Sequence, residues 1–356
     1  MRKESYTFFQ DLLAAPSPSG YEQPAQRVFR AYVSPFAQVS QDVLGNVYGT
    51  IPASGTERPR VMLVGHSDEI GLQVKYMDDN GFLFFGPIGG VDAHLTPGQR
   101  VKIHTLQGVV PGVIGKKPIH LMEPKDRETV VKLESQYIDI GAASRKEAEA
   151  LIRVGDPVTF ANGLERLHGD RVTSRGFDDK AGSFVVAEVL RQVAAATKKL
   201  PVELVGVSSV QEEVGLRGGT TSAYNVKPDL GICVEVDFCT DQPDVDRKHN
   251  GDVGLGKGPI LPRGANINPA LFELLADTAA REKIPVQFTG IPRATGTDAN
   301  VMQISRGGVA TALVKIPLRY MHTPVEVLSL TDLENAVKLI AATLYRIKDK
   351  AAFIPR

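Results

Sequence analysis

The stretch Val202–Gly215 reads VELVGVSSVQEEVG, and it places two adjacent acids, Glu212 and Glu213, directly after an apolar run. The run Val202–Val207 predicts a buried strand. Two neighbouring carboxylates at a strand end repel each other, and they are costly to desolvate unless a cation or a proton compensates them. A metal ion would do so, with one acid coordinating it and the other handling protons. An isolated Glu-Glu pair lies more often in an exposed turn, so the metal interpretation depends on further candidate ligands elsewhere in the chain.

The composition is that of an ordinary globular protein. Of the 356 residues, 42% are hydrophobic and 23% charged, and the 41 Lys and Arg balance the 41 Asp and Glu. This balance gives no reason to expect nucleic acid or an anionic membrane as a partner. The polar start and the absence of a long apolar run predict neither a signal peptide nor a membrane span. Two cysteines, Cys233 and Cys239, provide no disulfide framework, which predicts a cytoplasmic location.

Strand and helix patterns alternate over most of the chain, which predicts an α/β sandwich. From about residue 70 to 160 the pattern changes to short alternating segments separated by Gly and Pro, which predicts a small β-rich insertion. Outside it, we expect strands at 61–64, 202–208, 229–235 and 309–316, and helices at 5–14, 22–34, 180–196, 217–225, 268–283 and 330–348.

Acids or histidines follow five apolar segments. Ligands of open α/β sheets bind beyond the carboxyl ends of the strands, so these side chains can converge. Histidines with carboxylates suit Zn²⁺, Co²⁺ or Mn²⁺, and a carboxylate can bridge two ions. Each has a structural alternative: a packed histidine, an Asp helix cap, or a turn at Asp237. The five segments are His66-Ser67-Asp68, Asp178-Asp179-Lys180, Glu212-Glu213, Glu235 with Asp237, and His322.

Further motifs run in order over nearly the whole chain. Together they resemble the co-catalytic metallo-aminopeptidases of the tetrahedral (TET), glutamyl aminopeptidase and endoglucanase-like kind. The matching segments are Gly65-His66-Ser67-Asp68-Glu69-Ile70-Gly71, Pro87-Ile88-Gly89-Gly90, Gly112-Val113-Ile114-Gly115-Lys116-Lys117-Pro118, Ile138-Asp139-Ile140-Gly141-Ala142, Phe177-Asp178-Asp179-Lys180, Ser209–Gly218, Gly296-Thr297-Asp298-Ala299 and Arg319-Tyr320-Met321-His322-Thr323-Pro324.

The resemblance implies a mixed-sheet α/β/α catalytic domain, residues 1–68 and 166–356, interrupted by a small β-barrel-like insertion at 69–165 that serves dimerisation and assembly. It also implies a homo-oligomer, commonly dimers built into a dodecamer.

The resemblance further implies two divalent metal ions per subunit, Zn²⁺ or Co²⁺, with Mn²⁺ possible. Glu212 would be the general base, and Asp68 would orient His66 from behind. Asp178 would bridge the ions, and a cis peptide bond would join it to Asp179. The implied metal ligands are His66, Asp178, Glu213, Glu235 and His322.

One ligand position departs from the family pattern. The family usually has an Asp eight residues before the Pro of an Asp-x-Pro, here Asp241-Gln242-Pro243, but this chain has Glu235 there. We expect Glu235 to bind the ion of His66, because one extra methylene still allows coordination. Asp237 is the alternative.

The predicted function is therefore hydrolytic removal of the N-terminal residue from peptides, with Glu212 taking a proton from a water activated by the two ions. Arg217, Asp298 and Arg319 lie beside the motifs and are candidates for substrate binding, with ion pairing or helix capping as structural alternatives. The alternative functions are a dipeptidase, a carboxypeptidase or an N-deacylase of a related fold, and, in a different class, an inactive binding scaffold. A polysaccharide hydrolase is less favoured, because such enzymes need two carboxylates and no histidine ligands.

Overall fold

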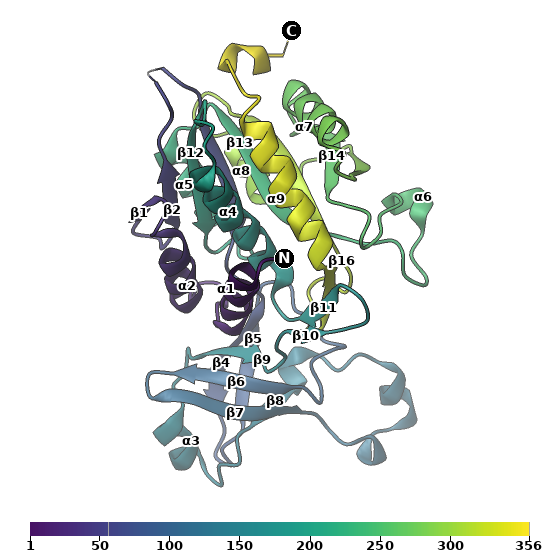
Figure 1. Cartoon of the computed structure of the whole chain (residues 1–356). Helices are drawn as coiled ribbons and strands as arrows, with labels where there is room; N and C mark the ends of the chain where they lie inside the picture. The colour runs from purple at the N-terminus through teal and green to yellow at the C-terminus, as the bar shows by residue number, and fades with distance from the viewer. Residues whose placement is uncertain (56, 356) are drawn as a thin grey trace.

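The computed structural model describes residues 1–55 and 57–355 of the chain. It has two parts: a sheet covered by helices on both faces, and a closed β-barrel below it in Figure 1. The large sheet has eight strands in the order β1-β2-β12-β3-β13-β16-β14-β15. Their bounds are β1 Gln38–Gln41, β2 Val47–Ile51, β3 Arg60–His66, β12 Glu203–Ser209, β13 Leu230–Phe238, β14 Ile260–Gly264, β15 Gln287–Ile291 and β16 Ala310–Leu318.

The centre of this sheet is parallel, because β12, β3, β13 and β16 run side by side in the same direction. These strands are nearly continuous apolar runs, as expected for strands that are buried on both faces. Antiparallel strands β1, β2 and β14 make the sheet mixed. All four central strands therefore end at the same edge of the sheet.

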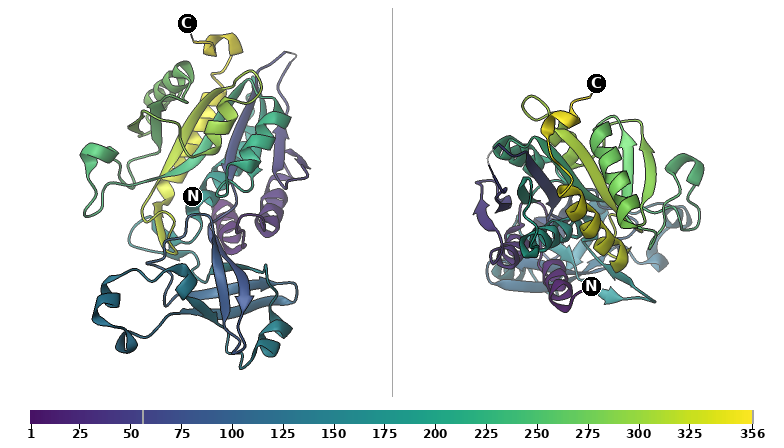
Figure 2. Two further views of the ribbon diagram at one scale, coloured as in Figure 1. Left: turned by 180° about the vertical axis from the view of Figure 1, so that it is seen from behind. Right: turned by 45° about the horizontal axis from the view of Figure 1, so that its top comes forward.

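Two sets of helices cover the sheet. Helices α1, α2, α4, α7 and α9 pack together on one face, and α5 and α8 pack on the other (Figure 1, Figure 2). Their bounds are α1 Lys3–Ala14, α2 Gln23–Val33, α4 Phe177–Ala195, α5 Arg217–Val226, α7 Pro269–Glu282, α8 Asp298–Gln303 and α9 Leu330–Leu344. The short α6, Arg247–Asn250, lies in the connection between β13 and β14. Within the described residues, none of these helices combines the length and the apolar character needed to cross a lipid bilayer.

The barrel strands follow the order β4-β5-β8-β7-β6-β9, and the barrel closes where β9 pairs with β4, two strands that are far apart in sequence. Its own apolar core is separate from that of the large sheet. The elements are β4 Gly71–Met77, β5 Leu83–Ile88, β6 Arg100–Thr105, β7 Gly108–Gly115, β8 Tyr137–Asp139, α3 Arg145–Leu151 and β9 Pro157–Phe160, with short 3-10 turns at Ile119–Leu121, Pro124–Glu128 and Leu133–Ser135. The predicted α/β fold with a β-barrel-like insertion is thus confirmed, and its division at residues 68/69 and 165/166 stays a prediction.

A small three-stranded sheet lies beside the start of α4. It consists of β10 Glu165–Arg166, β11 Arg171–Ser174 and β17 Glu326–Ser329. Helix α4 itself packs closely on β3, because a Cβ placed on Gly65 would come within 2.5 Å of the carbonyl carbon of Gly182. The missing side chain at Gly65 therefore lets the start of α4 lie directly against the end of β3.

A buried ion cluster joins the segment after β3 to the start of α4. The Glu69 carboxylate accepts hydrogen bonds from Lys180 Nζ at 2.9 Å, from Arg175 Nη1 and from Ser17 N at 2.9 Å. Lys180 also donates to Ala15 O at 2.7 Å, which ties in the connection between α1 and α2. Burial alone would raise the pKa of Glu69, but Arg175 and Lys180 lower it from 4.5 to about 2. Glu69 is therefore ionised near neutral pH, while burial lowers the pKa of its partner Lys180 to about 8.

Replacing Glu69 by Gln should destabilise the protein by about 3–5 kcal/mol, since two buried cations lose their counter-charge. Urea unfolding measures this free energy, with Glu149→Gln as control, because its pair with Arg145 is exposed to solvent and should contribute little. Because folding lowers the pKa of Glu69, its stabilisation is complete above about pH 4.5 and is lost as the pH falls towards 2. The difference between wild type and Glu69→Gln should therefore shrink on acidification, and a Glu69→Gln effect no larger than the control's would contradict this role.

Candidate metal centre

The acids and histidines predicted from the sequence meet at the edge where the parallel strands end. His66 is the last residue of β3, and Glu235 lies near the end of β13. Glu212 and Glu213 follow β12, and Asp178 lies in the first turn of α4. The backbone of Asp178 and of Asp179 is not helical, and the peptide bond between them is cis, as the resemblance implied. His322 follows β16 in a turn with a left-handed backbone, φ 60°.

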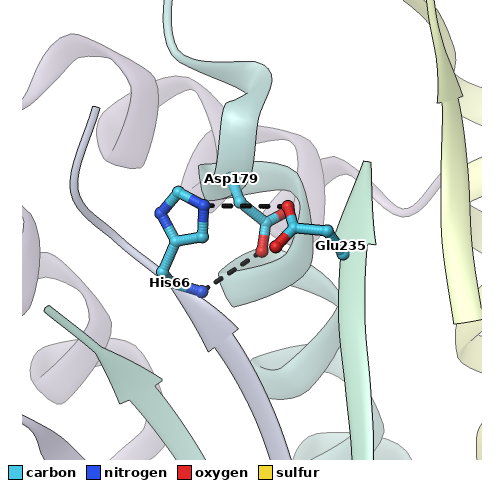
Figure 3. Close-up of side chains that lie close together, drawn as sticks. All are labelled: His66, Asp179 and Glu235. Carbon is cyan, nitrogen blue, oxygen red and sulfur yellow. Dashed lines mark hydrogen bonds and ion pairs between the residues drawn. The ribbon is translucent and has the colours of Figure 1, made fainter. Parts of the chain in front are cut away.

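The first group surrounds the His66 ring. Figure 3 shows His66, Asp179 and Glu235 converging from β3, α4 and β13. One ligand atom of each lies within 4.8 Å of the others, and all three side chains are buried. His66 Nε2 is 3.7 Å from Glu235 Oε1 and 3.2 Å from Asp178 Oδ1. The carboxylates of Asp178 and Glu235 therefore lie close to one imidazole nitrogen, with that of Asp179 in the same group, which is a suitable donor set for a divalent cation.

The second group consists of Asp178, Glu213 and His322, whose ligand atoms also lie within 4.8 Å of one another. His322 Nε2 is 3.3 Å from Asp178 Oδ2 and 3.5 Å from Glu213 Oε1. Asp178 thus directs one carboxylate oxygen to each histidine. This places it between the two groups, where a bridging ligand would have to lie.

The buried acids of the site need positive charge to be ionised together. Burial raises the pKa of Glu212 to about 10, with Glu235 and Asp298 adding to the effect, and burial together with Asp178 raises the pKa of Glu213 to about 8. For Asp178, burial acts in the same direction, but hydrogen bonds with the two histidines hold its pKa below its usual value. Glu213 Oε1 is buried and makes no hydrogen bond within the described residues. Divalent cations would compensate these acids, so the donor set fits two such ions.

Asp68 lies behind His66 and contacts both the imidazole ring and the turn after β12. His66 Nδ1 is 3.0 Å from the backbone oxygen of Asp68 and 3.3 Å from its carboxylate oxygen Oδ1. The carboxylate also accepts the backbone N–H groups of Glu212 at 3.0 Å and Glu213 at 3.2 Å. Ser19 Oγ donates to it at 2.6 Å. Asp68 therefore fixes both the histidine and the turn that carries the acid pair.

Apart from Asp179, the residues of the two groups line a cavity of about 480 Å³, together with Glu212, Gly296 and Thr297. Glu212 Oε2 is 3.8 Å from His66 Nε2, so this acid reaches the centre of the site while it is also in the cavity wall. Asp237 lines the same cavity but forms an ion pair with Lys315 at 3.0 Å. This geometry favours Glu235 over Asp237 as the partner of His66.

The three candidate substrate residues do not line this cavity. Arg217 is exposed and donates to Gln211 Oε1, and Arg319 forms an ion pair with Asp241 at 2.7 Å. Asp298 is 1% exposed and accepts a hydrogen bond from Ser209 Oγ at 2.6 Å. The structure thus places these residues around the site rather than within it, and their part in substrate binding stays a prediction.

The sequence placed Asp179 in one of the five convergent segments without assigning it a ligand role, and it did not indicate Ser19 or Glu326 as part of the site. Asp179 stands beside Asp178 in the sequence, and only the backbone conformation shows that its carboxylate also faces His66, whose backbone N–H it accepts at 3.2 Å. Ser19 lies in the Pro16–Gly20 segment, which the sequence marks only as a turn. Glu326 is four residues after His322, and no pattern indicated that it is buried.

Glu326 joins the two elements that carry the second group. Its carboxylate accepts the backbone N–H of Asp178 at 3.2 Å and that of His322 at 3.1 Å. The side chain is 2% exposed, so water does not compete for these hydrogen bonds. Glu326 therefore fixes the position of His322 relative to Asp178.

Replacing Glu326 by Gln should lower the affinity for the ion of the second group by about 10–100-fold, as for other residues that orient metal ligands. The amide nitrogen of Gln cannot accept a backbone N–H, so one of the two hydrogen bonds is lost. Titration of the metal-free protein with Zn²⁺ against a chelator measures both affinities. Equal weakening of both ions, or of neither, would rule out this specific role.

Comparison with known proteins agrees with these observations. The family description "M42 glutamyl aminopeptidase" matches residues 45–339. A lysyl aminopeptidase of Pyrococcus furiosus is 38% identical over 347 residues, which cover 96% of this chain and 97% of the relative.

Solved structures give the same result. A TET aminopeptidase from the marine sediment archaeon Thaumarchaeota archaeon SCGC AB-539-E09 superposes with a TM-score of 0.93 at 34% identity, covering 98% of each chain. A TET1 peptidase of Pyrococcus horikoshii, which can assemble into a tetrahedron or a large octahedral shell, gives a TM-score of 0.85 at 30% identity, covering 96% of this chain and 100% of its own. The resemblance inferred from the motifs is confirmed, and the chain belongs to the M42 glutamyl aminopeptidase family of metal-dependent aminopeptidases.

Proposed function

We propose that this aminopeptidase removes N-terminal residues from peptides at a site for two divalent metal ions. The observation that carries the proposal is the position of Asp178, with one carboxylate oxygen 3.2 Å from His66 Nε2 and the other 3.3 Å from His322 Nε2. His66 and Glu235 would hold one ion, Glu213 and His322 the other, and Asp178 would bind both. The mixed nitrogen and oxygen donors suit Zn²⁺ or Co²⁺, with Mn²⁺ as a further candidate.

Bound there, the ions would lower the pKa of a water molecule from 15.7 to about 7 and polarise the scissile carbonyl group. Glu212 would accept the proton of that water; its carboxylate lines the cavity and lies 3.8 Å from His66 Nε2, which supports this role. The same carboxyl group then donates the proton to the leaving amine. Asp68 holds the backbone N–H of Glu212 and so keeps this acid in position.

The same cavity can favour a free amino terminus. A free amino group can donate hydrogen bonds to the carboxylates that face the cavity, those of Asp178, Glu212, Glu213 and Glu235, whereas an acetylated nitrogen has only one N–H and carries an extra acyl group. The names of the relatives refer to different N-terminal residues, lysyl and glutamyl, so family membership alone leaves the preferred side chain open.

The test is hydrolysis of free-amine and N-acetylated anilides of Leu, Glu, Asp and Lys after loading with Zn²⁺, Co²⁺ or Mn²⁺. We expect cleavage of free-amine substrates only. Faster cleavage of the acetylated compounds would assign the protein to the N-deacylases instead. Release of C-terminal residues, or hydrolysis confined to dipeptides, would support the carboxypeptidase or dipeptidase alternatives.

We also propose that the protein works as a homo-oligomer, with the barrel region, residues 69–165, as the assembly module. The proposal is supported by the likeness to a peptidase that forms a tetrahedron or an octahedral shell. Exposed apolar side chains of the barrel region, among them Val109, Ile119 and Leu121, are available for such contacts. Light scattering should show dimers or a dodecamer, and a strict monomer at all concentrations would contradict it.

A further inference from the structure

One ion pair in the cavity wall is not used by the proposed chemistry. Asp237 lies two residues after Glu235 on β13, and Lys315 lies opposite Glu235 on the neighbouring parallel strand β16. Because side chains alternate along a strand, Asp237 and Glu235 point to the same face. Lys315 Nζ lies 3.0 Å from Asp237 Oδ2, and both side chains line the cavity of the metal groups.

The pair is largely shielded from solvent, with exposed fractions of 9% for Lys315 and 15% for Asp237. The second carboxylate oxygen of Asp237 accepts the backbone N–H of Phe238 at 3.1 Å, so both oxygens have partners. Lys315 is the only lysine or arginine among the described residues that line this cavity. The two charges therefore compensate each other in a place where water screens them little.

Apart from this pair, Glu212 and the acids and histidines of the metal groups, the described residues that line the cavity carry no charge, among them Phe238, Gly296, Thr297 and Met321. The cavity thus combines the acidic metal groups with uncharged residues and one internally compensated ion pair.

We propose that the Asp237–Lys315 pair forms the charge-neutral wall of the pocket for the N-terminal side chain of the substrate, so that the enzyme prefers uncharged N-terminal residues. This inference rests on the proposed aminopeptidase function. A lysine side chain in this pocket meets the Lys315 ammonium group, and a glutamate side chain meets the Asp237 carboxylate. Neither finds an opposite charge unless the existing pair is broken, which leaves a buried charge without a partner.

The same geometry predicts how selectivity changes when one charge is removed. Lys315→Met leaves the Asp237 carboxylate facing the pocket and should favour a lysine substrate. Asp237→Asn leaves the Lys315 ammonium group and should favour a glutamate substrate. The double variant removes both charges and should return to uncharged substrates, which makes it the matched control for both single variants.

The experiment compares kcat/KM for Leu, Lys and Glu anilides in the wild type, the two single variants and the double variant, with metal content measured for each. The wild type should prefer Leu over both charged substrates by about tenfold or more, and each single variant should shift its Lys-to-Glu ratio by about tenfold or more, in opposite directions. A wild type that prefers Lys or Glu over Leu would overturn the inference without any variant. Metal-loaded variants with the Lys-to-Glu ratio of the wild type would do the same.

Failure of the two proposals can be told apart. If the metal-loaded wild type cleaves no free-amine substrate, the proposed function itself is wrong. If it cleaves them but the substitutions change all three rates by the same factor, only the assignment of this wall is wrong.

Discussion

Replacing Glu212 by Gln should lower kcat by about 10²–10⁴-fold while the protein still binds both metal ions. Gln has nearly the same shape and keeps the backbone N–H that Asp68 accepts, but its amide cannot take a proton from water. The loss should therefore appear in kcat for every free-amine substrate. Steady-state kinetics on Leu anilide, with metal content determined by mass spectrometry, measure both quantities.

The neighbouring Glu213→Gln variant is the matched control, because it changes the same kind of side chain one residue away. Glu213 belongs to the second group with Asp178 and His322, so this variant should lose affinity for one ion. The pair thus separates proton transfer from coordination. Near wild-type turnover in a metal-loaded Glu212→Gln protein would show that another group accepts the proton.

Replacing Asp178 by Ala should weaken the binding of both ions. Activity should fall by roughly 10³-fold or more, since the ions contribute several kcal/mol to stabilising the transition state. One carboxylate oxygen faces His66 and the other faces His322, and among the described residues Asp178 is the only acid paired with both histidines. Metal stoichiometry after dialysis at a fixed free Zn²⁺ concentration is the direct readout.

Asp237→Asn provides the control for that experiment. Asp237 is an acid in the same cavity, but it pairs with Lys315 instead of a histidine, so this variant should keep two ions. If Asp178→Ala retained two ions, or lost only one of them, Asp178 would not bridge the groups.

The sequence predicted the four central strands of the large sheet, β3, β12, β13 and β16, because they are continuous apolar runs, but it did not predict the outer strands β1, β2, β14 and β15. The sequence predicted that the helix after Asp178-Asp179 begins at residue 180. The structure agrees in part, because α4 has regular helical geometry only after these two acids, whose non-helical backbone turns them into the site. The order of the barrel strands was not predictable in the same way. Strand β9 closes the barrel between β4 and β6, and such pairing depends on packing between distant segments rather than on local alternation.

The strand pattern alone could not tell whether Glu235 or Asp237 is the partner of His66. Both residues point to the same face of β13, so periodicity cannot distinguish them. The distinction comes from Lys315, 78 residues after Asp237, which forms an ion pair with that acid. Glu326 is hidden for a similar reason, since its contact with Asp178 joins residues 148 positions apart.

The measurement that tests the central claim most directly is removal and return of metal in the wild-type protein. Protein that mass spectrometry shows to be metal-free should not hydrolyse Leu anilide. Activity should return on titration with Zn²⁺ or Co²⁺ and level off near two ions per subunit. Sustained turnover by protein shown to be free of metal, or full activity at one ion per subunit, would contradict the two-ion site.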